Sequence, residues 1–312
     1  MIPEDTSALM LERGSPQPLG LSAGAMRVLV RPADGGRVAA FWREAAGRRA
    51  EVLMPMGDAG FDPLFWPKAG TYPLAPFSNR IRAGAFSFGE REVRLAAHPA
   101  CEPHALHGFS QLRDWHVTQR SAAQIEMRYR HDPAQAPDTW PWSFEAIQKI
   151  TLDPAGMTHE IGVESHADTD MPVGLGLHPY FAVARGDSIR FSAQAEWEQD
   201  EDGCATRLRR LEGSGCQQDR LHDGEPLTFY YAGWDGRAVI TRQDGATITI
   251  EADQPFDHLV VHVPPGGAYL CIEPVSHVAD AFNLASRGAA GTGMRVLAPG
   301  GAIWGRMRIG VT

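Results

Sequence analysis

Residues 237–251 read RAVITRQDGATITIE and show most directly which kind of fold this chain adopts. Apolar and polar side chains alternate on both sides of Asp244-Gly245, a dipeptide favoured by the type I′ turns of β-hairpins. Such alternation is typical of strands that pack one face on a core and turn the other toward water. The segment therefore predicts two antiparallel strands, at residues 237–243 and 246–251.

The same pattern recurs in both halves of the chain. Residues 27–43 predict two strands around a turn at residues 33–36, and residues 144–152 and 157–164 flank a turn at 153–156. Further strands are predicted at residues 85–95, 115–130, 188–197, 258–263, 268–273 and 302–311. The chain is therefore predicted to be all-β, with a large antiparallel sheet structure.

Helical patterns are nearly absent. Only residues 277–287 predict a short helix, and strands do not alternate with helices, which disfavours a doubly wound α/β sheet. The 33 Gly and 23 Pro residues agree with this, because many turns use them and helix interiors tolerate neither. No linker divides the chain, so we expect one domain over residues 1–312, with residues 1–19 as a peripheral or poorly ordered segment.

Composition excludes several classes of function. The 312 residues are 43% hydrophobic, which is enough for a core that needs no disulfide or metal. A formal net charge of -9 disfavours nucleic acids and anionic membrane surfaces as partners. We find no secretory signal and no apolar run of transmembrane length. Cys101, Cys204, Cys216 and Cys271 form no C-x-x-C pair and are interpreted as reduced thiols of a cytoplasmic protein.

A few segments depart from strand and turn patterns, and functional residues are often found in such loops. Residues 70–81 contain two prolines and aromatic side chains and end in Asn79-Arg80-Ile81. This composition suits a rigid loop that presents a guanidinium, whose fixed donors can hold two hydroxyls or a carboxylate. The alternative is a structural loop in which Arg80 caps a sheet edge.

Two histidine pairs raise the question of a metal site. His104 and His107 lie three residues apart, and His258 and His262 lie four apart on one predicted strand. The first pair has no evident third ligand, and the second pair is far apart along the strand face. We therefore expect no metal, and His107, which precedes Gly108, is a candidate for hydrogen bonding instead.

Two further segments place a histidine and a glutamate at rigid loop boundaries. Residues 174–181 lead through glycines to His178, which Pro179 holds in an extended conformation beside two aromatic residues. A predicted strand ends at Glu273, where Pro274 stops the ladder. A satisfied polar histidine and a salt-bridged structural glutamate are the alternatives, but the combination suggests an acid–base couple.

These motifs together resemble the aldose 1-epimerase (galactose mutarotase-like) family. The resemblance runs from about residue 20 to the C-terminus, and its anchors follow the family's order. They are Asn79-Arg80-Ile81, Leu106-His107-Gly108-Phe109 with Trp115, His178-Pro179-Tyr180-Phe181, Gly233-Trp234-Asp235-Gly236, and Cys271-Ile272-Glu273-Pro274 with Asp280-Ala281-Phe282-Asn283. Each motif is short, and their order along nearly the whole chain makes the resemblance specific.

The resemblance implies a fold and a reaction. The fold is a large antiparallel β-sandwich, called a supersandwich, that binds sugar in an open cleft on one face. The reaction is an isomerisation that interconverts the α and β anomers of a free aldose through the open-chain aldehyde. Glu273 resembles the general base that removes the proton of the anomeric hydroxyl, and His178 resembles the general acid that protonates the ring oxygen.

The resemblance also implies sugar-binding residues and no cofactor. Asn79, Arg80, His107 and Asp235 are expected to bind and orient ring hydroxyls. Opening a hemiacetal needs one proton removed and one delivered, so neither a metal nor a nucleotide is required. The expected partner is a small sugar, not a nucleic acid or a membrane, and the expected assembly is a monomer or a homodimer.

Alternatives to a free-hexose mutarotase stay open, because the neighbours of His178 and Pro274 depart from the galactose mutarotase pattern. One alternative is a hexose-6-phosphate 1-epimerase, or a mutarotase of a modified or acidic sugar, with Arg80, Arg82 or Arg113 as candidate cations. A second is a non-catalytic carbohydrate-binding module on the same fold. A third is a metal-dependent β-barrel isomerase.

Overall fold

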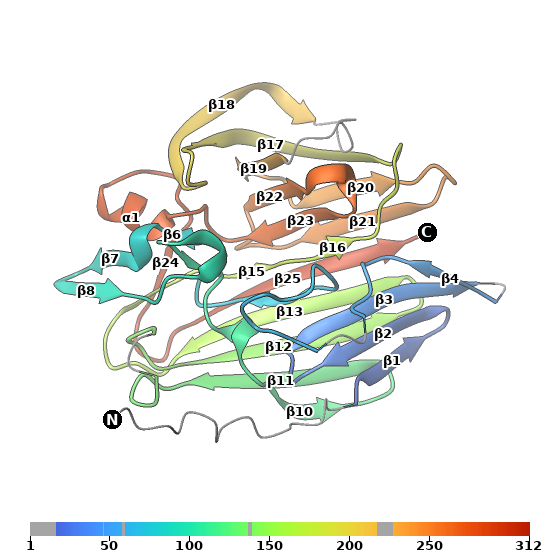
Figure 1. The fold of residues 1–312 in the computed structure, drawn as a ribbon, viewed down its shortest axis with the longest axis horizontal. Coiled ribbons are helices and arrows are strands. Elements are labelled where there is room, and N and C mark those ends of the chain that lie inside the picture. Colours follow the sequence, from blue (N-terminus) through green and yellow to red (C-terminus); the bar gives the residue numbers. More distant parts are fainter. Residues whose placement is uncertain (1–16, 46, 58–59, 137–138, 217–226) are drawn as a thin grey trace, which may run out of the picture.

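Two antiparallel sheets dominate the computed structural model (Figure 1), which describes residues 17–45, 47–57, 60–136, 139–216 and 227–312. The smaller sheet holds, in order, β1 (Leu19–Ala23), β2 (Met26–Arg31), β3 (Arg37–Ala45) and β4 (Arg48–Glu51). The larger sheet has 15 strands. The prediction of a large antiparallel all-β protein is thus confirmed.

The large sheet follows one long path. Its order is β10 (His116–Arg120), β11 (Gln124–His131), β12 (Phe144–Asp153), β13 (Gly156–Ser165), β25 (Ala302–Val311), β21 (Thr247–Ala252), β20 (Arg237–Thr241), β17 (Ser188–Gln199), β19 (Leu227–Ala232), β22 (His258–Val263), β23 (Leu270–Val275), β15 (Gly176–Leu177) and β5 (Pro73–Leu74). Off this path, β16 (Tyr180–Phe181) pairs with β23 and β18 (Ala205–Cys216) pairs with β17.

Three two-stranded pairs and short helices complete the described part of the chain. The pairs are β14 (Met171–Val173) with β24 (Arg295–Leu297), β6 (Arg80–Ile81) with β9 (Ala105–Leu106), and β7 (Ala85–Phe88) with β8 (Arg91–Arg94). The α-helix is α1 (Ala281–Ser286), and single 3₁₀ turns occupy Arg82–Gly84, Pro99–Cys101, Ser110–Leu112 and Pro265–Gly267. Among the described residues no helix has the length and apolar character needed to span a membrane.

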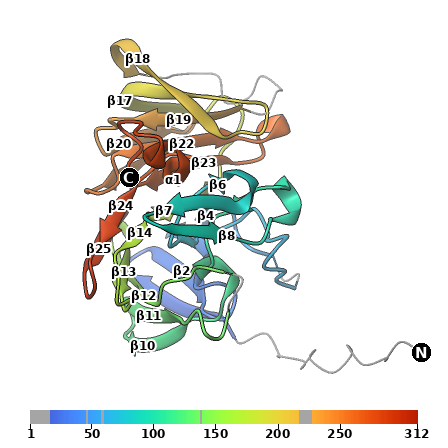
Figure 2. The ribbon, with the colours of Figure 1, turned by 90° about the vertical axis from the view of Figure 1, so that its left-hand side faces the viewer.

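The small sheet packs against one end of the large one. Figure 1 shows the small sheet beside the β10–β13 end, Figure 2 shows β2 next to these strands, and β1 and β2 both contact β12. Alternate residues of β2 are buried, among them Val28 and Val30, and they share one core with Ile125 and Phe144 from the large sheet. The period-two pattern therefore arises because each strand presents one face to this core.

Several hairpins lie where the alternation predicts them, although turn details differ. Strands β2–β3, β12–β13 and β20–β21 confirm the predicted pairs. The expected type I′ turn at Asp244-Gly245 is wrong. Gly245 has a positive φ of 86°, Asp244 does not, and Arg242 N–H donates to the Ala246 carbonyl across a longer loop. One left-handed glycine is enough for this loop, whereas a type I′ turn needs two left-handed residues.

Two predicted single strands are hairpins. Residues 85–95 divide into β7 and β8 because Gly89 turns the chain with a φ of 58°. Residues 115–130 divide into β10 and β11 around Ser121, whose N–H donates to the Gln124 carbonyl. The predicted helix at 277–287 is the shorter α1. The one-domain organisation stays a prediction, and residues 1–16 of the expected peripheral segment 1–19 lie outside the described residues.

An aromatic cluster supports the loop that carries Asn79 and Arg80. Trp140 is buried, and its ring centroid lies 5.8 Å from that of Phe77, 5.3 Å from that of Phe86 and 5.6 Å from that of Phe282 on α1. Tilted and edge-on ring pairs at such distances add stability beyond simple burial. The loop that ends at Arg80 is therefore anchored on one side by packed rings.

Gly108 is a position where a side chain should be costly. Its φ is 67°, and a Cβ would lie 2.3 Å from the Ala75 carbonyl oxygen, which accepts hydrogen bonds from the Phe109 and Ser110 amides. Gly89 has a similar φ of 58° with no atom within 4 Å of its Cβ position. We expect Gly108→Ala to lower the free energy of unfolding by about 1–3 kcal/mol more than Gly89→Ala.

Urea denaturation of the two variants tests this expectation. Both substitutions share the cost of a left-handed alanine, roughly 1–2 kcal/mol, so the difference isolates the collision with Ala75. Equal losses in Gly108→Ala and Gly89→Ala would mean that the backbone around residue 75 moves aside freely.

Candidate active site

The register of β23 brings His178 and Glu273 together. β16 pairs with β23 through Tyr180 and Cys271, and β15 keeps the same register on the other side. Two residues further along each strand from the Tyr180–Cys271 pair, the same register sets His178 opposite Glu273. Opposed residues of antiparallel strands have neighbouring side chains on one face of the sheet. The proline after His178 interrupts the ladder and leaves the histidine between the two short strands.

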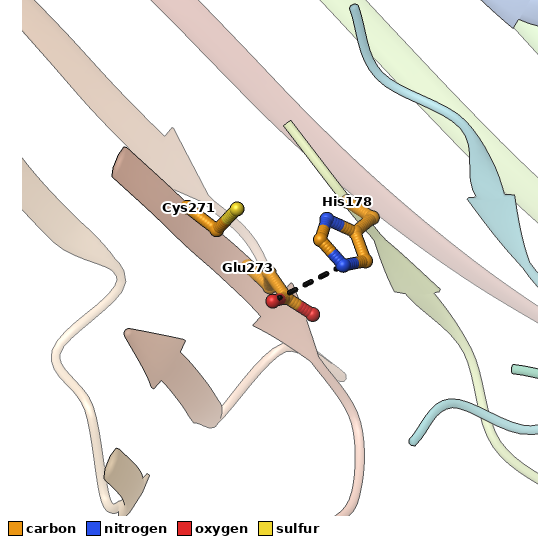
Figure 3. Close-up of side chains that lie close together, drawn as sticks. All are labelled: His178, Cys271 and Glu273. Carbon is orange, nitrogen blue, oxygen red and sulfur yellow. Dashed lines mark ion pairs between the residues drawn. The ribbon is translucent and has the colours of Figure 1, made fainter. Parts of the chain in front are cut away.

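The two side chains meet in a buried position. The His178 Nε2 and Glu273 Oε1 atoms are 3.4 Å apart, and the residues are only 6% and 3% exposed. In Figure 3 the imidazole of His178 and the carboxylate of Glu273 point toward each other from adjacent segments. The His178 backbone N–H donates to the Tyr72 carbonyl at 3.1 Å, which holds the segment in place. The two residues predicted as an acid–base couple therefore lie in contact, and their roles stay a prediction.

Two tyrosines pack against the His178 ring. The Tyr72 ring stacks on it with centroids 4.8 Å apart, and the Tyr180 ring stacks with centroids 4.6 Å apart and planes at 10°. The two tyrosine hydroxyls are 3.3 Å apart, and Trp66 Nε1–H donates to the Tyr180 hydroxyl at 3.2 Å. A ring restrained in this way loses little orientational freedom when substrate binds.

Burial changes the protonation of the pair. It raises the pKa of Glu273 to about 8, against the opposing effect of Arg80 and Lys68. It also lowers the pKa of His178 well below its ordinary value, with a smaller contribution from His107. The raised pKa of Glu273 and the lowered pKa of His178 both favour the uncharged form of each group. The pair therefore carries one proton around neutral pH, which the two side chains can share across their 3.4 Å contact.

His107 and Asn79 form a second fixed unit. Both have positive φ angles, 63° and 55°, and both are buried. The Asn79 backbone N–H donates to His107 Nδ1 at 3.1 Å, while the His107 N–H donates to the Asn79 carbonyl at 2.9 Å. Burial and the nearby Arg80 lower the pKa of His107 well below its ordinary value. A neutral ring that accepts at Nδ1 carries its proton on Nε2, so His107 is a hydrogen-bond donor there.

A cleft of about 470 Å³ joins these groups. That volume is within the range of small-molecule sites. The lining includes polar or charged side chains from distant parts of the chain: Lys68, Asn79, Arg80, His107, His178, Thr228, Tyr230, His262, Tyr269 and Glu273. Trp66 and the exposed Phe65 add aromatic surface. Polar donors and acceptors beside aromatic rings suit a ligand with many hydroxyls.

Of the predicted site residues, five line the cleft and one does not. Asn79, Arg80, His107, His178 and Glu273 lie together in it. Asp235 lies instead in a separate surface pocket, and its Oδ1 accepts from the Arg237 N–H at 3.0 Å. The expectation that Asp235 orients ring hydroxyls therefore disagrees with the geometry. The tight turn before β20 directs its carboxylate to its own backbone.

The other candidate cations do not line the cleft either. Arg82 is paired with Asp200, and its Nε lies 3.5 Å from Asp280, a buried carboxylate beside α1. Arg113 has a lowering effect on the pKa values of Tyr129 and His131, and neither of these residues lines the cleft. Arg82 therefore has a structural role at the edge of the site.

Several cleft residues carry no clear signal in the sequence. Lys68, Trp66 and Tyr269 come from irregular segments, and the spacing of His262 from His258 suggests only a metal ligand. Tyr72 is fully buried behind His178. The strand pattern of residues 258–263 is the one sequence feature that could place His262 near Glu273, because it puts both residues in strands.

Donor atoms suitable for a metal occur in two groups of the described residues. One is His178, Cys271 and Glu273, and the other is Glu145, Glu164 and His166. His104 belongs to neither group, and its Nδ1 accepts a hydrogen bond from the Ala83 N–H at 3.0 Å.

Comparison with solved structures defines the class of fold. The chain is similar to a galactose mutarotase-like protein from Clostridium acetobutylicum, with a TM-score of 0.80, 19% identity and 95% of each chain covered. It is also similar to galactose 1-epimerase from Lactobacillus acidophilus NCFM, with a TM-score of 0.71, 14% identity, and 95% of this chain and 94% of that chain covered. The fold is therefore a galactose mutarotase-like β-sandwich.

The family follows from the sequence match. Residues 23–310 match the model of the aldose 1-epimerase family, and the chain belongs to this family. YphB, an uncharacterized protein of Escherichia coli K12, is 26% identical over 277 residues, which cover 83% of this chain and 88% of YphB. The family suggests an epimerase, and the cleft of about 470 Å³ contains the His178–Glu273 pair.

Proposed function

We propose that the protein is an aldose 1-epimerase that interconverts the α and β anomers of a free hexose. The observation that supports this most strongly is the pair of His178 and Glu273, 3.4 Å apart in the cleft. Ring opening of a cyclic sugar removes a proton from the anomeric hydroxyl and delivers one to the ring oxygen. Two adjacent groups that share one proton supply both transfers.

In the proposed reaction Glu273 and His178 exchange roles between the two half-reactions. With the shared proton on His178, the Glu273 carboxylate takes the proton of the anomeric hydroxyl while His178 protonates the ring oxygen. The ring bond breaks and the aldehyde forms, which leaves Glu273 protonated and His178 neutral. After rotation about C1–C2, the ring oxygen attacks the other aldehyde face. The carboxyl then returns its proton to O1, and His178 takes the proton of the attacking hydroxyl.

Neighbouring groups are proposed to hold the sugar for this exchange. His107 presents Nε2–H, and Arg80 presents guanidinium N–H groups from a position fixed by Asn79 Oδ1, which accepts from Arg80 Nη1 at 3.3 Å. Buried donors of fixed orientation lower the entropic cost of placing the anomeric carbon at the pair. These contacts support a role in binding for Asn79, Arg80 and His107.

The pH dependence follows from the single shared proton. We expect kcat/KM to stay level across neutral pH and to fall about tenfold per unit above about pH 8, where Glu273 loses the last proton of the pair. The acid limb should lie well below pH 6.5, because the pKa of His178 is lowered. Initial rates between pH 5 and 10 test this; a rate that rises through pH 8 would contradict a singly protonated active form.

Polarimetry tests the proposed function itself. Freshly dissolved α-glucose, α-galactose and other free aldoses should reach their equilibrium rotation faster in proportion to enzyme concentration. If none does, while a sugar still binds, the chain would be a non-catalytic carbohydrate-binding module. If activity is lost to a chelator and returns with metal, a metal-dependent isomerase would be the correct alternative.

A second candidate, a mutarotase of an anionic sugar such as a hexose 6-phosphate, is favoured by two cations in the cleft. Lys68 and Arg80 both line it, and neither forms an ion pair with a carboxylate of the described residues. Lys149, the other lysine in the sequence, is the matched control. If the anionic sugar is the substrate, Lys68→Gln should raise its KM about tenfold or more and Lys149→Gln should not.

The remaining expectations are part of the same proposal. The reaction as written uses no cofactor, and the partner is a small sugar and not nucleic acid or membrane. We propose a cytoplasmic location and a monomer or homodimer. Size-exclusion chromatography with light scattering measures the assembly state.

A further inference from the structure

Cys271 lies beside the acid–base pair and takes no part in the proposed proton transfers. It is two residues before Glu273 on β23, so both side chains extend from the same face of the strand. The thiol is fully buried and is not part of the cleft lining, whereas His178 and Glu273 are. Figure 3 shows its sulfur beside the imidazole, on the side away from the ion pair.

The three side chains offer one donor atom each within a small volume. A His178 nitrogen, the Cys271 Sγ and a Glu273 oxygen all lie within 4.8 Å of one another. Zinc binds nitrogen, sulfur and oxygen at about 2.0–2.3 Å, which sets tetrahedral ligands roughly 3.3–3.8 Å apart. The 3.4 Å between His178 Nε2 and Glu273 Oε1 already meets this spacing, and small rotations would bring in the sulfur.

The second ring nitrogen of His178, Nδ1, is available to a ligand. Its Nδ1 is buried and has no hydrogen-bond partner among the described residues. One ion takes one ring nitrogen, so Nδ1 is the alternative to Nε2 as the donor, and an ion bound there would relieve its desolvation cost. The two tyrosine rings that pack against His178 restrain its orientation.

We propose that His178, Cys271 and Glu273 form a site for a thiophilic divalent cation such as Zn²⁺, which inhibits the enzyme when it binds. The ion would enter through the cleft, and the cleft side would supply the fourth ligand as water. It replaces the thiol proton and the shared proton of the pair, so binding releases up to two protons to solvent. The atoms that transfer protons are then occupied, and anomer exchange stops.

Cobalt binding tests the site without any use of activity. Full-length protein freed of metal is titrated with Co²⁺, and a thiolate-to-cobalt charge-transfer band is expected that Zn²⁺ abolishes. Cys271→Ser should lose the band while keeping nearly the same side-chain volume, and Cys271→Ala should behave alike. Cys101→Ala is the matched control, since Cys101 is a free thiol that lines the same cleft outside the donor group. The Cys101→Ala variant should show the same charge-transfer band as the wild type.

Inhibition is the second readout, and it depends on the proposed function. Zn²⁺ should slow mutarotation reversibly, a chelator should restore the rate, and Cys271→Ser should weaken inhibition by about 10–100-fold. The absence of a band in the wild type, or a band that survives Cys271→Ser and Cys271→Ala, would overturn the site. Acceleration by Zn²⁺ would overturn its inhibitory role. A band in a protein without mutarotase activity would refute the proposed function but leave the site standing.

Discussion

Glu273→Gln is expected to lower kcat for anomer exchange by about 10²–10⁴-fold. The amide has almost the shape of the carboxyl, but it cannot release the shared proton or accept one from the anomeric hydroxyl. Glu273 is 3% exposed, with His178 Nε2 3.4 Å from its Oε1, so solvent buffers cannot readily take its place. The loss should therefore fall on kcat, with a change in KM of no more than a few-fold.

Two measurements support the interpretation of this variant. Thermal unfolding should show no loss of stability, because burial already favours the uncharged carboxyl of Glu273 and the amide is an uncharged group of nearly the same shape. Sugar binding by calorimetry should stay close to that of the wild type. A Glu273→Gln enzyme with near-normal kcat would show that another group carries the proton.

His178→Asn is expected to have an effect of similar size, about 10²–10⁴-fold on kcat. Asparagine keeps a hydrogen-bonding side chain but has no titratable nitrogen, and it loses the stacked contacts with Tyr72 and Tyr180. The double variant with Glu273→Gln should be hardly slower than either single one, because the two groups act as one unit. Steady-state rates of the three variants measure this coupling.

The matched control for His178 is His262→Asn. His262 also lines the cleft, and its Nδ1 lies 2.8 Å from the Thr228 hydroxyl rather than beside Glu273. We expect a change in KM and at most a few-fold change in kcat.

Strictly multiplicative losses in the His178→Asn, Glu273→Gln double variant would contradict a shared proton.

Much of the fold could be predicted because the strands are amphipathic. Alternation in residues 144–152 and 157–164 corresponds to β12 and β13, which bury one face each. The exact turn chemistry could not be predicted, since Asp244-Gly245 fits both a two-residue and a longer loop until the pairing of Thr241 with Thr247 is known. Strands β18 and β19 are not predicted, because charged residues crowd the first and apolar residues do not alternate with polar ones in the second.

The site was predictable where a rigid local signal coincided with chemistry. His178 precedes a proline and Glu273 lies on a predicted strand, and the sheet register joins them. The expected strand end at Glu273 is wrong, because β23 continues through Pro274 to Val275, with Pro274 opposite Leu259. Tyr72 and Lys68 carry no such signal, because their proximity to the pair depends on tertiary packing. Asp235 shows the opposite error: the motif was found, but its turn sends the carboxylate to the Arg237 amide.

The most direct test of the central claim is exchange spectroscopy by NMR on sugars already at anomeric equilibrium. Magnetisation transfer between the α and β signals of glucose, galactose and glucose 6-phosphate reports the exchange rate without any net reaction. The account predicts that the wild type accelerates exchange of at least one of these sugars in proportion to enzyme concentration, and that Glu273→Gln and His178→Asn do not. Exchange no faster than in buffer for every sugar tried, or equal acceleration by Glu273→Gln, would contradict it.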